Sequence, residues 1–157
     1  MDRVNARREV RESTMHVAER PERVFPLLCP VREYDWIETW SATLVHSDSG
    51  VAEKGCVFTT DDPHGARSVW TVSRYDPAVP AIEFVIVTPG LLVTTLEVSL
   101  EPEGDGTLAR WRRTFTALTP AGERAIGALA GPAYEARMER LERQLDHYLR
   151  TGEMLRS

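Results

Sequence analysis

Seven strand-like runs and one long helical stretch constrain the possible fold most strongly. The first run is STMHVAE, residues 13–19, and six more follow between residues 42 and 118. They are rich in β-branched and aromatic residues, and sequences containing Gly, Pro or Asp separate them. From Pro120 to about Gly152 the apolar period becomes helical, and Gly131-Pro132 should break or kink the helix. The six later runs are ATLVHS, GCVFTT, RSVWTVSRY, AIEFVIVT, LLVTTLEVSLE and TLARWRRTFTAL.

Two short helices are expected between the first run and the second. Pro21 opens PERVFPLL, which Pro26 interrupts, and Pro30 opens a second helix to about Trp40. Strands joined by short turns imply an antiparallel meander whose apolar face needs a cover. The C-terminal helix is the only element large enough, so the predicted fold class is α+β. Its expected apolar stripe comprises Ile126, Leu129, Ala133, Leu141, Leu145, Tyr148 and Leu149.

The two strands that flank EGDG show whether apolar and polar residues alternate as expected for a sheet with one buried face. They can pair through a two-residue turn at Gly104-Asp105 or at Asp105-Gly106. Either choice places Arg113 on the otherwise apolar face. Three arrangements of Arg113 are therefore possible. It faces inward and needs a carboxylate from the protein or from a ligand, or its side chain reaches out to the sheet edge. In the third, a bulge rotates it outward. The predicted apolar face comprises Thr94, Leu96, Val98, Leu100, Ala109, Trp111, Arg113 and Phe115.

Composition excludes several classes of function. The 157 residues are expected to form a single domain, with a core over about 13–152. A net charge of −5 argues against nucleic acid as a partner. No signal peptide or membrane-spanning run is visible, and two cysteines do not make a disulfide framework, which predicts a cytoplasmic protein. The scattered His16, His46, His64 and His147 predict no metal site, and no cofactor motif is present.

Three stretches carry a resemblance to a known group: PERVFPLLCPVREYDWIETW, SDSGVAEKGCVFTT and WRRTFTALTPAGE. With the order of elements, they resemble the SRPBCC superfamily, which includes START lipid-transfer domains, birch-pollen-allergen-like proteins and bacterial polyketide cyclases. The resemblance covers nearly the whole chain and is most specific for a bacterial subfamily of unassigned function. It implies a helix-grip fold, in which a seven-stranded antiparallel sheet wraps around the C-terminal helix and encloses a cavity. The superfamily has no shared catalytic motif, so the resemblance assigns no catalytic residue.

The stretch LLCPVREYDWIETW contains three carboxylates with different expected environments. At 100° per residue, Glu33 lies within the arc formed by Ile37 and Trp40, whereas Asp35 and Glu38 lie opposite or at the margin. Glu33 is therefore either a carboxylate facing the cavity or an ordinary acidic residue favoured by the helix dipole in the first turn.

These patterns predict that the protein binds a small, mainly hydrophobic ligand, such as a lipid or a polyketide-like molecule. Glu33 and Arg113 would orient it within an aromatic lining. One alternative is an enzyme of the cyclase or dehydratase kind, with Glu33 as general acid or base and Arg113 holding a carbonyl or enolate oxygen. Another is a protein-interaction scaffold with a filled core. The sequence does not decide the oligomeric state. The aromatic residues expected to line the site are Trp36, Trp40, Trp70, Phe84, Trp111 and Phe115.

Overall fold

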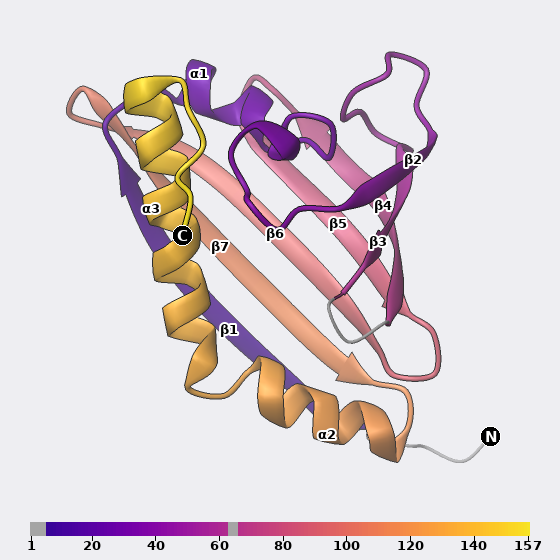
Figure 1. The fold of residues 1–157 in the computed structure, drawn as a ribbon. Helices are drawn as coiled ribbons and strands as arrows, with labels where there is room; N and C mark the ends of the chain where they lie inside the picture. The colour runs from indigo at the N-terminus through magenta and orange to yellow at the C-terminus, as the bar shows by residue number, and fades with distance from the viewer. Residues whose placement is uncertain (1–5, 63–65) are drawn as a thin grey trace.

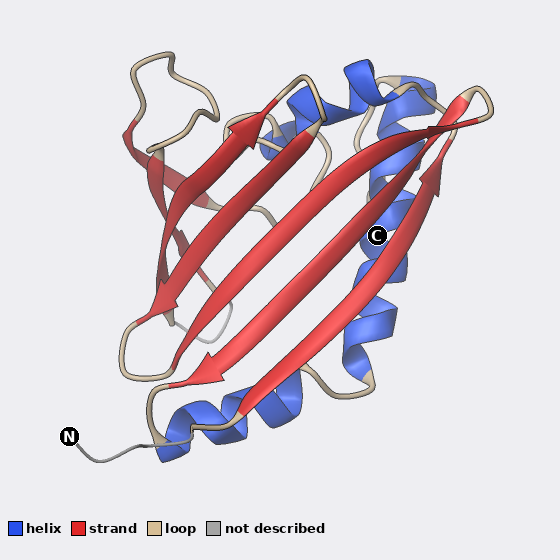
Figure 2. Cartoon of the chain, turned by 180° about the vertical axis from the view of Figure 1, so that it is seen from behind, coloured by secondary structure: helices blue, strands red, loops and turns tan. Residues whose placement is uncertain are grey.

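A curved antiparallel sheet of seven strands forms the framework of the protein. The computed structural model describes residues 6–62 and 66–157. The strand order is β1-β7-β6-β5-β4-β3-β2, so β2 to β7 form a meander and β1 pairs with the last strand. All helices lie on one face of the sheet, and Figure 2 shows the other face uncovered. The strands are β1 (Arg8–Val17), β2 (Ala42–His46), β3 (Val57–Asp61), β4 (Arg67–Asp76), β5 (Ala81–Thr88), β6 (Leu92–Glu103) and β7 (Gly106–Ala117).

The hairpin between β6 and β7 has the predicted inward face. Glu103 pairs with Gly106, so the turn residues are Gly104 and Asp105, and Gly104 has a φ of +58°. Leu96 pairs with Arg113 and Val98 with Trp111, which places these side chains on the face that the helices cover. The alternation of apolar and polar residues therefore predicted the inward face correctly, and the structure selects the first of the two possible turns.

The first strand begins earlier than expected, at Arg8 rather than residue 13. It pairs with β7 along its whole length, from Arg8 opposite Thr116 to Val17 opposite Thr107. Backbone pairing with a long neighbour extends the strand into a segment that is too charged to be recognised by hydrophobicity alone.

Two helices follow the sheet: α2 (Pro120–Leu129) and α3 (Ala133–Thr151). The Thr119 hydroxyl caps α2 by accepting a hydrogen bond from the Gly122 amide at 3.1 Å. The expected break at Gly131-Pro132 separates α2 from α3, and in Figure 1 the two helices run in different directions. Ala133 is exposed, contrary to the predicted stripe, and Tyr134 is buried instead. The chain changes direction at Pro132, so the buried positions of α3 do not continue the helical spacing of those in α2.

Only the first of the two predicted short helices forms as a helix. α1 (Pro21–Val24) continues into the 3-10 turn η1 (Phe25–Leu27). The expected helix from Pro30 to Trp40 contains only the 3-10 turn η2 (Glu33–Asp35). The Trp36 indole donates to the Leu27 carbonyl at 3.0 Å, and the Trp40 indole donates to the Pro30 carbonyl at 2.8 Å. A short helix is marginal by itself, and these two anchors stabilise an irregular path instead.

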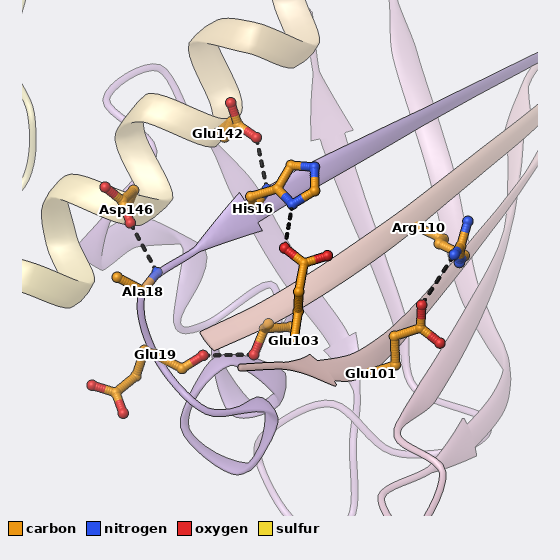
Figure 3. A network of polar contacts seen from close by, with 9 residues as sticks. His16, Ala18, Glu19, Glu101, Glu103, Arg110, Glu142 and Asp146 are labelled. Atoms are coloured by element: carbon orange, nitrogen blue, oxygen red, sulfur yellow. Dashed lines mark hydrogen bonds and ion pairs between the residues drawn. The ribbon is translucent and has the colours of Figure 1, made fainter. Parts of the chain in front are cut away.

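Helix α3 protects the exposed edge of β1. Figure 3 shows Glu142 accepting from the His16 backbone amide at 2.8 Å and Asp146 accepting from the Ala18 amide at 3.2 Å. The His16 imidazole also lies 2.7 Å from a Glu103 carboxylate oxygen at the end of β6. Unpaired amides on an edge strand invite pairing with another chain. These two carboxylates hold α3 against the sheet and satisfy two amides at the C-terminal end of this edge.

The buried side chains form two clusters. The larger lies between the inner face of the sheet, residues 24–40 and α3. The smaller lies beneath α2 and contains Leu92, Phe115, Ala117, Ile126 and Ala130. No helix within residues 6–62 and 66–157 is long and apolar enough to cross a membrane.

Candidate functional site

A partly open cavity of about 220 Å³ lies next to the larger cluster. Its walls come from β4 to β7, the segment 28–40 and α3. Glu33 and Arg113 are its only ionisable lining residues in the part of the chain that the structure describes. The remaining lining residues are Leu28, Ile37, Trp40, Trp70, Phe84, Leu96, Val98, Trp111 and Leu141.

One wall of the cavity is aromatic. The Trp70 ring lies 5.6 Å from Phe84 and 6.0 Å from Trp40, both in edge-to-face geometry. The Trp70 indole donates to the Thr60 hydroxyl at 2.8 Å, and the Trp40 indole is already bonded to a backbone carbonyl. Both N–H groups therefore have acceptors in the protein, and these two tryptophans present apolar surface to the cavity.

Glu33 lines the cavity even though the predicted helix around it is absent. Its backbone amide donates to the Cys29 carbonyl at 2.8 Å, and its carbonyl accepts from the Ile37 amide at 2.9 Å. These local turns preserve the spacing that places Glu33, Ile37 and Trp40 on one side, as the helical projection predicted. Burial raises the pKa of the Glu33 carboxyl to about 8, and the positive charge of Arg113 opposes that rise. At neutral pH the carboxyl is predominantly protonated.

Arg113 reaches the cavity from β7. Its Nη1 lies 3.1 Å from the Met138 sulfur, a weak acceptor. Its guanidinium carbon lies 5.6 Å from the centre of the Trp111 ring and 6.0 Å from that of Tyr134. Burial lowers the pKa of Arg113, whereas Tyr134 favours the charged form. Since an arginine keeps its proton in proteins, the group remains a cation.

No direct ion pair joins Glu33 and Arg113 among the described residues. The two groups line the same cavity and interact through their charges. The carboxylate partner that an inward-facing arginine would need is therefore not supplied at contact distance by the described part of the protein. By contrast, Asp35 and Glu38 pair with Arg32 and Arg140 outside the cavity.

Trp111 carries the one buried side-chain polar atom without a hydrogen-bond partner in residues 6–62 and 66–157, its indole nitrogen. The residue is only 4% exposed and lines the cavity beside Arg113. A buried N–H without an acceptor is costly, so this indole nitrogen is an unsatisfied donor in the packing around the cavity.

Two residues predicted to line the site lie outside the cavity wall. Trp36 is fully buried, and its indole is bonded to the chain at Leu27, so it anchors the segment 28–40. Phe115 lies two residues beyond Arg113 on the same face of β7, where it packs with Ile126 beneath α2. The period of a strand fixes the face of a side chain but not its position along the sheet.

The structure also shows where the two cysteines lie. Cys29 and Cys56 are buried and unpaired with each other. No group of three or more His, Cys, Asp or Glu side chains in the described ranges could hold a metal ion. His64 lies outside the described residues.

Comparison with known proteins identifies the family. The model of the family described as polyketide cyclase / dehydrase and lipid transport matches residues 8–146. The chain belongs to this family. No curated protein matches the sequence.

Solved structures similar to this member of the polyketide cyclase / dehydrase and lipid transport family share its fold. Truncated norcoclaurine synthase from Thalictrum flavum has a TM-score of 0.70 and 12% identity, covering 96% of this chain and 98% of that chain. Ara h 8.0201 has a TM-score of 0.62 and 14% identity, with coverages of 90% and 97%. DynU16, from the dynemicin biosynthetic locus, has a TM-score of 0.61 and 16% identity, covering 92% of this chain but 48% of the other. They confirm the helix-grip fold.

Proposed function

We propose that the protein binds a small, mainly apolar molecule in its internal cavity. The observation that carries this proposal is an aromatic and aliphatic cavity of about 220 Å³ with only two ionisable groups in its described lining. Ligand sites are typically apolar concavities with a few polar groups that fix orientation. Among proteins of the same fold, norcoclaurine synthase has been solved in complex with dopamine and hydroxybenzaldehyde, which are one-ring molecules.

The volume limits the size of the ligand. Pockets for drug-sized molecules are about 300–1,000 Å³, whereas a dry cavity of about 150 Å³ can admit benzene. At about 220 Å³, the cavity matches a substituted single ring better than a lipid chain or a multi-ring polyketide. A scaffold with a filled core fits less well because this space lies between the sheet and the helix that covers it.

A second candidate is an enzyme of the cyclase or dehydratase kind. The observation that favours it is the pKa of Glu33, raised to about 8, which would let the carboxyl donate a proton near neutral pH. Arg113 in the same cavity would stabilise a developing oxyanion. Turnover of a candidate substrate should be lost in Glu33→Gln if this function is real, whereas a protein that only binds has no turnover to lose.

Binding can be tested through the tryptophans, because three of the four line the cavity. Toluene should change the emission of the native protein in a saturable way. Leu141→Phe should weaken this response because Leu141 lines the cavity, whereas Leu149→Phe on the same helix should retain it. An emission that toluene does not change, together with no small molecule released on denaturation, would reject the proposal.

A further inference from the structure

The polar groups of the cavity are mainly hydrogen-bond donors. The Arg113 guanidinium presents N–H groups, one of which meets the Met138 sulfur, a weak acceptor, and the Tyr134 side chain also hydrogen-bonds to the guanidinium. The Trp111 indole N–H has no partner within the described chain. The carboxyl of Glu33 also lines the cavity and, while protonated, supplies a further O–H. The Trp40 and Trp70 indoles do not add to this set because they already donate to Pro30 and Thr60.

The charge of the cavity is also unbalanced. With the Glu33 carboxyl protonated, Arg113 is the only charged side chain in the described lining. Arg113 is only partly exposed, and a partly desolvated cation without a counter-ion at contact distance is unfavourable. An anion entering the cavity would therefore supply the missing charge and stronger acceptors than the Met138 sulfur.

We propose that the cavity binds a single-ring or similarly small apolar acid, with its carboxylate against the Arg113 guanidinium and the Trp111 indole N–H. The two side chains are neighbours, since the guanidinium carbon lies over the indole ring, 5.6 Å from its centre. The apolar body of the ligand would lie against Trp40, Trp70 and Phe84. This inference rests on the proposed function and specifies the chemical class of the ligand.

The direct test compares three one-ring probes at pH 7: benzoate, toluene and benzylammonium. They have similar apolar bodies and differ in charge, so calorimetric affinities separate charge recognition from apolar burial. Benzoate should bind at least about tenfold more tightly than benzylammonium, because hydrogen bonds to a charged group contribute about 1.5–3 kcal/mol. Equal affinities, or a preference for benzylammonium, would overturn the inference.

Toluene keeps this result distinct from that of the parent proposal. If toluene binds and benzoate shows no advantage over benzylammonium, the cavity takes apolar molecules but does not select acids. If none of the three binds, the proposed function itself fails.

Substitutions locate the bound carboxylate. Arg113→Met keeps a long apolar side chain without charge and should weaken benzoate binding about tenfold or more while changing toluene binding by about twofold or less. Trp111→Phe keeps an aromatic ring without the N–H and should weaken benzoate by about two- to tenfold. Arg137→Met is the matched control, because Arg137 stands over the same Tyr134 ring but does not line the cavity. Undiminished benzoate affinity in Arg113→Met would place the anion elsewhere and overturn the inference.

The pH dependence gives a readout on the native protein that needs no arginine variant. The charged group that acts on Glu33 is Arg113 on β7, and no other titratable side chain is in the described lining from β4 to β6 or α3. Ionised Glu33 would repel benzoate and compete for Arg113, so benzoate affinity should fall as the pH rises from 7 to 9.5. Glu33→Gln should bind benzoate equally well at both pH values. A native affinity that stays constant over this range would show that the carboxylate does not lie near Glu33.

Discussion

Replacing Glu33 by glutamine should remove a specific pH dependence from the folding stability of this protein. The amide has nearly the same shape as the protonated carboxyl but does not ionise. In the native protein the carboxyl lines the cavity, and burial raises its pKa from 4.5 to about 8. Comparing the two proteins therefore isolates the ionisation of one partly buried group.

The sign follows from proton binding in the two states. Between pH 4.5 and 8 the folded protein holds a proton on Glu33 that the unfolded chain has released. The free energy of unfolding of the native protein must therefore fall with rising pH across this window, relative to Glu33→Gln. The stability that the Glu33 proton contributes to the free energy of unfolding is fully present below pH 4.5 and is lost by about pH 8.

The magnitude follows from the width of the window. Each pH unit contributes about 1.4 kcal/mol while the difference in bound protons is one. Full burial over this window would give about 5 kcal/mol. The side chain is only partly buried, so the expected fall is about 3–5 kcal/mol, a large part of the 5–15 kcal/mol typical of a domain.

Urea unfolding at intervals from pH 4.5 to 9 measures the difference directly, because contributions from other groups cancel between the two proteins. Glu22→Gln provides the control, since Glu22 is exposed on α1, and its difference from the native protein should stay nearly constant. A pH-independent difference for Glu33→Gln would mean that Glu33 ionises like a hydrated carboxyl. The assignment of Glu33 to a desolvated position in the cavity wall would then be wrong.

Three further changes test the framework around the cavity. Leu145→Ala should destabilise the protein by about 2–5 kcal/mol in urea unfolding because the side chain is fully buried, whereas exposed Arg143→Ala on the same helix should stay within about 0.5 kcal/mol. Thr119→Ala should cost about 1 kcal/mol by removing the cap of α2, and Thr119→Ser should restore most of it; equal losses in the two variants would show that the hydroxyl is unimportant. Gly122→Ala should lower the melting temperature markedly because a Cβ there would overlap the Leu91 carbonyl oxygen, and an unchanged melting temperature would show that α2 does not pack there.

The local pattern of the sequence was sufficient to predict the main helices and strands. The alternation along β6 and β7 follows from the pleat of a strand, so it identified the inward face and placed Arg113 on it before any tertiary contact was known. Gly131 and Pro132 likewise separate α2 from α3 through their own backbone preferences. The spacing of Glu33, Ile37 and Trp40 correctly gathered three side chains that line one cavity.

Tertiary packing determined features that the helical and strand periodicities of the sequence could not predict. The segment around Glu33 follows an irregular path that is anchored by the bond from the Trp36 indole to the Leu27 carbonyl, nine residues earlier. Phe115 shares a face with Arg113, yet packing beneath α2 places it outside the cavity. The raised pKa of Glu33 and the unpartnered N–H of Trp111 depend on which groups surround them in space. Sequence spacing determines direction over a few residues, whereas desolvation depends on elements that are far apart in the chain.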